Sequence, residues 1–327
     1  MDSLPLNVPS VSIVILTYNT RALLVACLAS IREQAIGCEV IVVDNDSTDG
    51  SAAAVRSEFP EVVLVVNPVN AGFAQGMNIG LQQATGEFVL ALNADTTILA
   101  ETIPTLLEAA ASLPRAGILG PVQYLPGEHG EATGPMLASA FADPSLLREA
   151  ARLLAFTDSV AARLALGPWR RPSNEPPRAV DWLMGAALLF RRACLRDIGG
   201  FDEGQFMYGE DWDICMRARR AGWAVYLVPQ SRIVHHENAA GRQYFGAGRR
   251  ARVLLGNLHF HEVHFGVASR RALAALHLVG AGLRLGLLLP LRVVKGARAG
   301  SAPRWNAHVE EARAAARGMR RTKVPAR

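Results

Sequence analysis

GEFVLALNAD, residues 86–95, decides how this chain is expected to fold. The run from Phe88 to Leu92 is continuously apolar, which is typical of a strand buried on both faces of a parallel sheet. It leads directly into Asn93 and Asp95. Ligands of open α/β sheets bind at the carboxyl ends of the strands, so Asp95 is a candidate metal ligand. An Asp after a strand is also a common turn former, and other segments must decide between these interpretations.

The surrounding sequence repeats the same alternation of short apolar runs and helix-length periodic segments. Expected strands cover residues 11–19, 38–45, 62–67 and 86–95, and expected helices cover 20–33, 50–59, 72–84 and 100–112. The alternation is typical of βαβ units. We therefore expect an α/β fold with a mostly parallel central sheet and helices on both faces. The sheet should resume at 179–192 and finish at 223–236.

Composition divides the chain into three parts. Residues 1–240 are expected to form one α/β domain, in which 126–178, rich in Gly, Pro, Ala and Arg, reads as an insertion or lid around a helical stretch at 145–166. Residues 1–240 hold 17 Lys and Arg against 26 Asp and Glu, whereas residues 241–327 hold 17 against 3. A basic extension on an acidic body indicates an anionic surface as its partner.

The basic extension contains an apolar stretch at 272–290. His277 and Arg284 lie inside it, and both are costly at the centre of a bilayer. An amphipathic helix or hairpin at a membrane surface is therefore favoured over a span, with a buried core helix as the other alternative. His259, His261 and His264 have metal-like spacing, but membrane-surface packing is favoured for them. Residues 313–327 are expected to form a solvated basic tail.

Cysteine usage and the N-terminus indicate a cytoplasmic protein. The four cysteines are far apart and lack CxxC spacing, and Cys27, Cys194 and Cys215 lie in apolar periodic stretches, as reduced core residues do. The first ten residues lack a basic segment followed by an apolar run, so no secretory signal is expected. Together with the basic extension, this predicts a peripheral protein at the inner face of the cell membrane.

Several ordered motifs resemble those of the family 2 glycosyltransferases, most closely the rhamnosyltransferase-like branch that builds bacterial surface polysaccharides. The resemblance covers residues 11–238 and rests on VSIVILTYN, VDNDSTDG, NAGFAQGMNIG, LNAD, VDWLMGAALLFRR with IGGFDEGQFMYGEDWDICMRARRAGW, and the closing VHH. It implies a GT-A fold and a metal-dependent, inverting transfer. The donor would be dTDP-rhamnose or a UDP-sugar, the acceptor a saccharide or a lipid-linked saccharide, and the metal Mn²⁺ or Mg²⁺.

The resemblance assigns Asp95 to the metal. A diphosphate leaving group develops negative charge, and a divalent cation held by few carboxylates stabilises it. The family signature has two aspartates flanking one residue, whereas this chain has Asn93 at the first position. Asn93 is therefore expected to bind ribose or phosphate. A histidine near the end of the sheet completes the metal site in related enzymes; His236 is favoured over His235, although either could be an interior histidine.

The resemblance also implies a nucleotide site. Asp44 would accept the imino proton of uracil or thymine, which cytosine lacks, or it could form only an Asx turn. Thr17 and Asn19 would flank the nucleoside, although Thr17 could be plain core. Gly72, Phe73 and Asn78, where a Gly-rich turn enters a helix, would form the floor beneath the nucleotide-sugar.

Asp211 is the expected general base. An inverting transfer needs one carboxylate to accept the proton of the acceptor hydroxyl, and the family's Glu-Asp pair maps onto Glu210 and Asp211. Asp213 is expected to be structural. Trp182 could stack on a sugar, although a buried Trp in a core strand is equally common. Gly185 could leave room for the acceptor, and Glu210 could contact it.

Other functions fit the sequence less well. A sugar nucleotidyltransferase would open its first strand into a Gly-rich loop, but here the strand opens into LTYNTRALL. A sugar-nucleotide-binding scaffold without catalysis is disfavoured because Asp95 and Asp211 are both present. A nucleic-acid partner is not expected, because the basic residues accompany an apolar stretch rather than an aromatic stacking platform.

Overall fold

The computed structural model of the chain describes residues 10–34, 37–127, 132–135, 139–154, 175–236, 248–295 and 302–320. These residues fall into two compact units. The first comprises the described residues within 10–141, 175–206 and 213–236, and the second those within 142–154, 207–212, 248–295 and 302–320.

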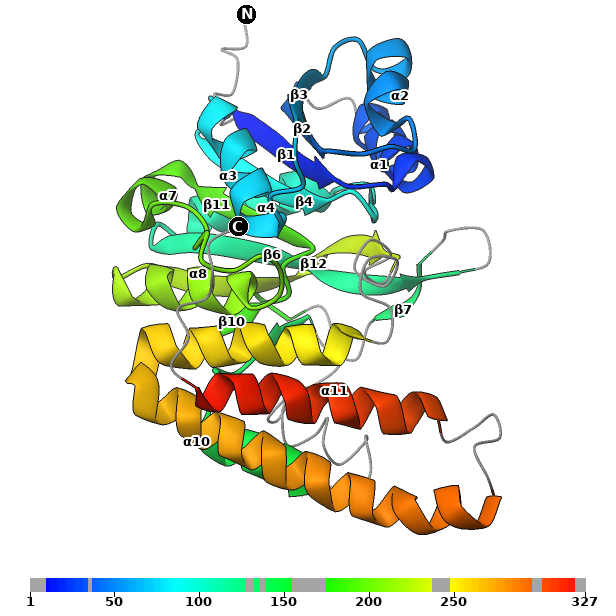
Figure 1. The fold of residues 1–327 in the computed structure, drawn as a ribbon. Helices are drawn as coiled ribbons and strands as arrows, with labels where there is room; N and C mark the ends of the chain where they lie inside the picture. Colours follow the sequence, from blue (N-terminus) through cyan, green and yellow to red (C-terminus); the bar gives the residue numbers. More distant parts are fainter. Residues whose placement is uncertain are drawn as a thin grey trace, which may run out of the picture. The chain divides into compact units, whose positions relative to one another are not determined.

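A mixed β-sheet forms the centre of the first unit (Figure 1). Its strand order is β3-β2-β1-β4-β11-β6-β12-β5, with β7 beside β6 and β9 beside β12. Parallel pairing joins β1 (Val11–Thr17), β2 (Glu39–Asn45), β3 (Val63–Asn67) and β4 (Phe88–Asn93), and also β6 (Ala116–Pro126) and β12 (Ala224–His235). Antiparallel pairing adds β5 (Thr96–Ile98), β7 (Ala132–Pro135), β9 (Arg178–Ala179) and β11 (Ala187–Arg191).

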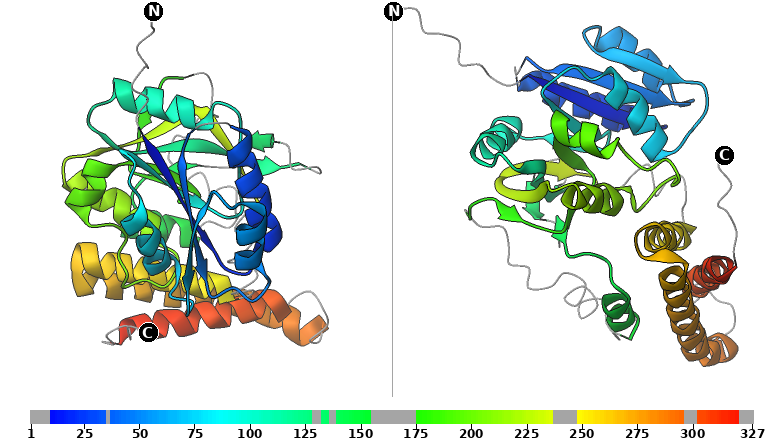
Figure 2. Two further views of the ribbon diagram at one scale, coloured as in Figure 1. Left: turned by 90° about the horizontal axis from the view of Figure 1, so that it is seen from above. Right: turned by 90° about the vertical axis from the view of Figure 1, so that its left-hand side faces the viewer.

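Helices cover both faces of this sheet, as β1 illustrates. Ile13 and Ile15 belong to the hydrophobic core that includes Leu24 and Leu28 of one helix. The alternate residue Val14 faces another helix, whose Gly80 has no room for a β-carbon beside it. Such alternation is required of a strand buried on both faces. Figure 2 shows the helices around the sheet from two further sides: α1 (Arg21–Glu33), α2 (Ser51–Glu58), α3 (Phe73–Gln83), α4 (Thr102–Ser112), α7 (Arg192–Ile198) and α8 (Glu210–Arg220).

The parallel strands bring several polar residues to one edge of the sheet. Thr17 lies opposite Asp44 in the pairing of β1 with β2, and Asn93 ends β4 opposite Leu16. Past Asp95 the chain reverses into β5, which pairs with the end of β12 so that Thr96 lies opposite His235. The sheet therefore gathers the ends of β1, β2, β4 and β12 by backbone pairing alone.

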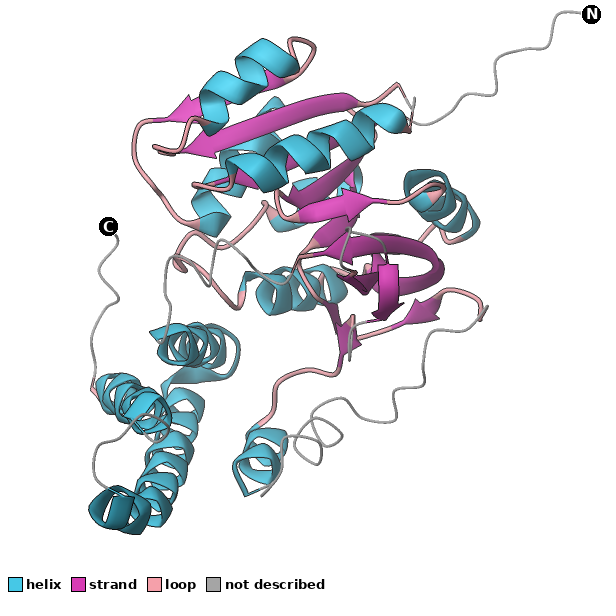
Figure 3. Cartoon of the chain, turned by 90° about the vertical axis from the view of Figure 1, so that its right-hand side faces the viewer, coloured by secondary structure: helices cyan, strands magenta, loops and turns pink. Residues whose placement is uncertain are grey.

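The second unit is helical in its described part, as Figure 3 shows. It contains α5 (Leu146–Leu154), α10 (Arg249–Lys295) and α11 (Ala302–Met319), and the first three residues of α8 also belong to it. Helix α10 is kinked at Gly266, which has φ of 83° and ψ of 171°. Only glycine adopts this combination without strain.

A buried polar cluster holds the three helices of the second unit together. Nε2 of His277 lies 2.7 Å from Glu149 Oε1, and its Nδ1 lies 2.8 Å from Glu311 Oε1. Burial lowers the pKa of His277, but the hydrogen bonds to the two carboxylates outweigh it, and the pKa is raised overall. The histidine in the apolar stretch is therefore a hydrogen-bonded link between α5, α10 and α11.

Two expectations for the extension are wrong. The predicted solvated tail begins at 313, but α11 continues to Met319, and Ala314 and Ala315 are fully buried against α10. Alanine has the highest helix propensity and lets helices approach closely, which explains the difference. His261, predicted to pack at a membrane surface, is buried and lies 2.8 Å from Ser269 Oγ across the kink. Residues 321–327, and 155–166 of the predicted helix in the insertion, lie outside the described residues.

The expected core cysteines are confirmed. Cys27, Cys194 and Cys215 are buried free thiols, and Cys38 is half-buried. Burial raises the pKa of Cys27 to about 12, so this thiol stays protonated and behaves as a small apolar side chain.

Candidate active site

Two loops at the ends of β1 and β2 are hydrogen-bonded to each other. Asn19 has a positive φ of 51°, its Oδ1 accepts from the N–H of Thr48 at 2.7 Å, and its own N–H donates to Ser47 Oγ at 3.0 Å. The hydroxyls of Thr17 and Thr20 lie 2.9 Å apart. Both predicted nucleoside-flanking residues, Thr17 and Asn19, thus lie in one rigid rim beside Asp44.

The carboxylate of Asp44 forms the Asx turn that the sequence offered as one alternative, and it uses only one of its two oxygens to do so. Its Oδ1 accepts from the N–H of Ser47 at 2.8 Å, which closes an Asx turn. Its Oδ2 is buried and accepts no hydrogen bond from any described residue. A buried carboxylate oxygen is costly to leave unpaired, so this atom is suited to a ligand that donates an N–H.

An asparagine network that the sequence analysis missed shapes the loop between β3 and α3. The side chain of Asn45 donates from Nδ2 to Asn70 Oδ1 at 2.9 Å and to Gly72 O at 3.2 Å. Its Oδ1 accepts from Asn67 Nδ2 and from the N–H of Ala71. Because all four hydrogen-bonding positions of this buried amide are used, it fixes the entry into α3.

The entry into α3 is also held from the other side. Gly72 has φ of 83°, and a β-carbon there would lie 2.3 Å from the carbonyl oxygen of Phe206. That carbonyl accepts from the N–H of Phe73 at 2.7 Å. The close approach of the two backbones requires glycine at position 72. The N–H of Phe73, the first amide of α3, is used in the hydrogen bond to Phe206.

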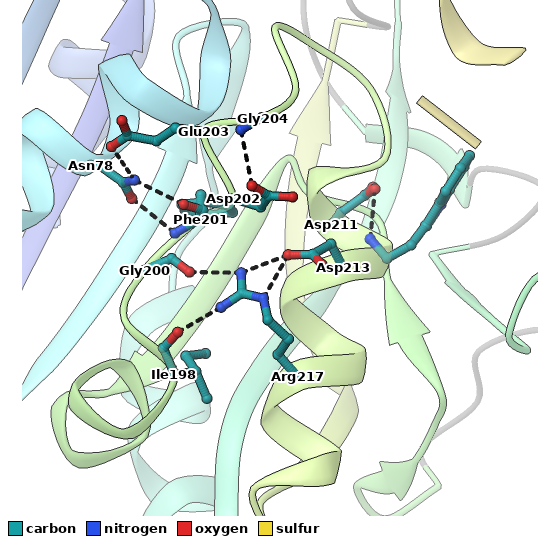
Figure 4. A network of polar contacts seen from close by, with 11 residues as sticks. Asn78, Ile198, Gly200, Phe201, Asp202, Glu203, Gly204, Asp211, Asp213 and Arg217 are labelled. Atoms are coloured by element: carbon teal, nitrogen blue, oxygen red, sulfur yellow. Dashed lines mark hydrogen bonds and ion pairs between the residues drawn. The ribbon is translucent and has the colours of Figure 1, made fainter. Parts of the chain in front are cut away.

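Asn78 connects α3 to the loop that precedes α8 (Figure 4). Its Nδ2 donates to Phe201 O and to Glu203, and its Oδ1 accepts from the N–H of Phe201. Arg217 of α8 clamps the same loop through the carbonyls of Ile198 and Gly200. Asn78 therefore supports the loop, and a part for it in donor binding stays a prediction.

Asp95 is buried beside His235. His235 Nε2 lies 3.2 Å from Asp95 Oδ1, although the two do not form a regular hydrogen bond. On the other side of the ring, Nδ1 lies 3.0 Å from Gln123 Oε1. Gln123 is fixed in turn, since its Nε2 donates to Met184 O at 3.1 Å. Nδ1 of His235 must therefore donate the proton, which leaves Nε2 facing the carboxylate.

This pair fits one edge of an octahedral metal site. Adjacent ligands of a cation with bonds of about 2.1 Å lie about 3.0 Å apart, close to the separation of 3.2 Å here. His236 is next to the pair: its N–H donates to Asp95 O, and its Nε2 lies 3.4 Å from Thr97 Oγ1. Burial lowers the pKa of His236, although the nearby charge of Asp95 raises it.

A metal site here would have few protein ligands. Across the described residues no three His, Cys, Asp or Glu side chains are arranged to hold an ion. Two protein ligands are sufficient for a cation that also binds substrate phosphates, as Mg²⁺ typically does. Asn93, half-buried at the end of β4, lies two residues before Asp95.

Two predicted acceptor residues, Trp182 and Gly185, lie in or just after a short strand that contributes to an aromatic stack. Trp182 of β10 (Trp182–Leu183) is stacked on Phe141 of β8 (Ala140–Phe141), with ring centroids 4.2 Å apart and planes at 12°. Trp182 is half-buried, and Gly185 lies between β10 and β11. One face of Trp182 is therefore used within the protein.

Asp211 lies in the first turn of α8. Its Oδ1 accepts from the N–H of Trp212 at 3.0 Å (Figure 4), and Glu210 precedes it. Asp213, one residue after Trp212, is buried and forms an ion pair with Arg217 at 2.6 Å. Glu210 and Asp211 belong to the second compact unit, whereas the strand-edge residues belong to the first.

Comparison with known families decides the identity of this arrangement. The family model "Glycosyl transferase family 2" matches residues 12–196, which contain the strand-edge site from Thr17 to Asp95. The chain belongs to glycosyl transferase family 2. It is a glycosyltransferase, as the motifs predicted.

A named relative places this glycosyltransferase in the predicted branch. This chain is 33% identical over 220 residues to the N-acetylglucosaminyl-diphospho-decaprenol L-rhamnosyltransferase of Mycobacterium tuberculosis, and the match covers 62% of this chain and 68% of the relative. The similarity to a rhamnosyltransferase confirms the resemblance to that branch.

Solved structures confirm the GT-A fold of the glycosyltransferase. A mannosyltransferase of Pyrobaculum calidifontis, solved with GDP-Man and Mn²⁺, is similar with a TM-score of 0.51 and 20% identity, over 95% of this chain and 87% of that one. GalNAc-T7, solved with UDP, GalNAc and Mn²⁺, is similar with a TM-score of 0.55 and 18% identity, over 70% of this chain and 43% of that one. Because the sequence identities are this low, the similarity is evidence for the fold alone.

Two supporting residues of the glycosyltransferase, Asn45 and Gln123, were missed by the sequence analysis. Asn45 and Gln123 are buried amides in otherwise apolar strands, and that contrast was the available signal. His235 was named but placed second to His236. The two amides act by fixing another group, so each can be recognised only once its partners are known.

Proposed function

We propose that this glycosyltransferase transfers a sugar, with inversion, from a pyrimidine diphosphate sugar to a saccharide carried on a diphospho-lipid, in bacterial surface polysaccharide synthesis. dTDP-rhamnose is the favoured donor and a UDP-sugar the second. The observation that supports this most is the buried Oδ2 of Asp44, which accepts no hydrogen bond from the described residues. It is complementary to the imino N–H of thymine or uracil.

The chain's own residues would position the donor. Asp44 binds the base, the rim of Thr17 and Asn19 encloses the nucleoside, and Asn93 donates to ribose or phosphate. The loop fixed by Asn45 presents Gly72 and Phe73 beneath the sugar. Asp44 would bind the base without rearrangement of the Asx turn, because its Oδ2 lies outside that turn.

Asp95 and His235 would hold the divalent ion, with His236 as the alternative that the sequence favoured. When bound, Mn²⁺ or Mg²⁺ supplies positive charge that stabilises the diphosphate leaving group. Gln123 keeps the proton of His235 on Nδ1, so that Nε2 offers a lone pair. Mn²⁺ in two solved structures of the same fold is consistent with this choice.

Asp211 would act as the general base. Its position in the first turn of α8 favours the carboxylate form through the helix dipole. The carboxylate accepts the proton of the acceptor hydroxyl as the hydroxyl oxygen attacks the anomeric carbon, while the bond to the diphosphate oxygen breaks. A single displacement of this kind inverts the configuration. Glu210 would contact the acceptor.

The acceptor class is proposed from the named relative, which acts on an N-acetylglucosaminyl-diphospho-decaprenol. Residues 1–240 would carry the glycosyltransferase reaction, with 126–178 as an insertion, and Trp182 and Gly185 would border the acceptor. Residues 241–327 would attach the protein to the membrane that holds such a lipid.

Asp44→Asn tests the donor assignment. Asparagine keeps the Asx-turn acceptor but presents an N–H₂ group where Oδ2 was. A charged hydrogen bond contributes about 1.5–3 kcal/mol, so the KM for dTDP-rhamnose should rise roughly 10- to 100-fold. The same variant should gain relative preference for cytidine diphosphate sugars. The measurement is donor consumption across a panel of sugar nucleotides; unchanged base preference would show that Asp44 does not read the base.

The membrane contact is proposed for one stripe of α10. α10 is the one helix in the described chain that is long and apolar enough to cross a bilayer, over Arg249–Leu289. It is kinked at Gly266, and its His277 is hydrogen-bonded to two carboxylates. Val279, Leu283 and Leu287, spaced by four residues, are 63%, 58% and 69% exposed. This favours a helix lying on the inner membrane surface over a span.

Leu283→Glu should weaken this contact. Burying a leucine in lipid contributes about 1.5–3 kcal/mol, and a charge in its place adds repulsion from anionic lipid. We expect at least a tenfold loss of co-sedimentation with vesicles containing phosphatidylglycerol. Val63→Glu, at an exposed apolar site of β3 in the other unit, is the matched control and should bind normally. Equal binding by the two variants would refute the stripe.

A further inference from the structure

Two buried polar groups lie one turn apart on the first half of α10. Asn257 is 9% exposed, and its Oδ1 accepts no hydrogen bond from the described residues. His261 is 1% exposed, and its Nε2 likewise has no hydrogen-bonding partner among them. Residues four apart lie on the same helical face. Each unpaired group costs free energy, so two together on one face need an explanation.

The same face carries an aromatic contact to the segment of the proposed base. Phe260 is buried and meets the ring of Trp212 edge-to-face, with centroids 6.1 Å apart and planes at 84°. Trp212 directly follows Asp211 in the chain, and its N–H is bonded to the Asp211 carboxylate. Residues 207–212 and α10 belong to the same compact unit. The polar pair and the base are thus parts of one body.

His261 is held in one orientation and kept neutral. Its Nδ1 lies 2.8 Å from Ser269 Oγ, across the kink at Gly266. Burial lowers the pKa of His261, although Glu149 raises it, and His264 lowers it further. A neutral imidazole whose Nδ1 is occupied presents Nε2 as a single, directed hydrogen-bonding atom.

We infer that Asn257 and His261 are recognition residues for the hydroxyl groups of the saccharide acceptor. An amide oxygen and a neutral imidazole nitrogen are both suited to sugar hydroxyls, which donate and accept hydrogen bonds. Trp212, in contact with Phe260, adds an aromatic ring of the kind on which sugars stack. This inference rests on the proposed function, because it takes Asp211 to be the base that acts on the same acceptor.

Asn257→Leu and His261→Leu separate recognition from structure. Replacing an unpaired buried polar group by an apolar one of similar size leaves the fold as stable or more so. We therefore expect an unchanged or raised melting temperature for Asn257→Leu, and for His261→Leu a melting temperature no lower than that of Ser269→Ala, which loses the same bond across the kink. Each leucine variant should show about a tenfold rise in KM for the acceptor. The KM for the sugar nucleotide should stay within twofold. Ser269→Ala, which removes only the bond across the kink, should leave the acceptor KM within threefold.

The acceptor probe is a synthetic N-acetylglucosaminyl diphosphate with a short prenyl chain, used for turnover and for calorimetric binding to the full chain. Weaker probe binding by both leucine variants, with a normal KM for the donor, supports the inference. If the parent binds the probe without turning it over, that outcome refutes only the proposed reaction. The inference is overturned if both variants bind the probe as the parent does, if donor and acceptor KM rise together, or if the parent does not bind the probe.

Discussion

Asp211→Asn is expected to lower kcat for sugar transfer by about 10²- to 10⁴-fold, the usual contribution of a positioned general base. The amide keeps the size of the side chain and can still accept the hydrogen bond from the N–H of Trp212. It cannot take a proton from the acceptor hydroxyl. The loss should therefore fall on kcat, measured by release of the nucleoside diphosphate with saturating acceptor.

The control for this variant is donor binding. Asp44 and Asp95 belong to the other compact unit, so calorimetric affinity for dTDP with Mn²⁺ should equal that of the parent. Asp211→Glu should recover part of the activity, because a carboxylate returns in a shifted position. An Asp211→Asn protein with a kcat within threefold of the parent would remove Asp211 from the reaction.

Asp95→Asn is expected to abolish the dependence on divalent metal. Loss of the anionic ligand weakens Mn²⁺ binding, and the leaving group then loses several kcal/mol of charge stabilisation, equivalent to a decrease on the order of 10³-fold in kcat. Binding of Mn²⁺ itself, followed by electron paramagnetic resonance in the presence of dTDP, gives a readout independent of turnover. Unchanged Mn²⁺ affinity in this variant would contradict the proposed site.

The two histidines can be separated in the same experiment. His235 Nε2 lies 3.2 Å from Asp95 Oδ1, whereas Nε2 of His236 lies 3.4 Å from Thr97 Oγ1. We therefore expect His235→Ala to weaken Mn²⁺ binding at least tenfold and His236→Ala to change it less than threefold. The reverse order would restore the assignment that the sequence favoured.

The choice between His235 and His236 shows where sequence reasoning stops. Successive residues of a strand point to opposite faces, so the two rings diverge, and the pairing register decides which one meets Asp95. β12 contains an irregularity between Val228 and Arg232, where its register with β6 shifts. Such a bulge breaks the alternation that could be counted from the sequence.

The strand-edge site could be predicted because it depends on local patterns. Apolar runs ending at Thr17, Asp44 and Asp95 identify parallel strands, and parallel strands share one edge. The four hydrogen bonds of Asn45 join segments 22 to 27 residues apart, so they become visible only in the fold. The basic residues of 313–327 predict a solvated tail, whereas the burial of Ala314 and Ala315 against α10 depends on contacts that only the fold reveals.

The central claim is that a metal held through Asp95 and a base at Asp211 act on opposite sides of one sugar. The most direct measurement is a crystal structure of the full chain with Mn²⁺ and a non-hydrolysable phosphonate analogue of dTDP-rhamnose. We predict Mn²⁺ bound to Asp95 and the diphosphate, with the Asp211 carboxylate facing the anomeric carbon from the side opposite the phosphonate. A carboxylate on the same side as the diphosphate, or separated from the anomeric carbon by more than one pyranose ring, would contradict the account.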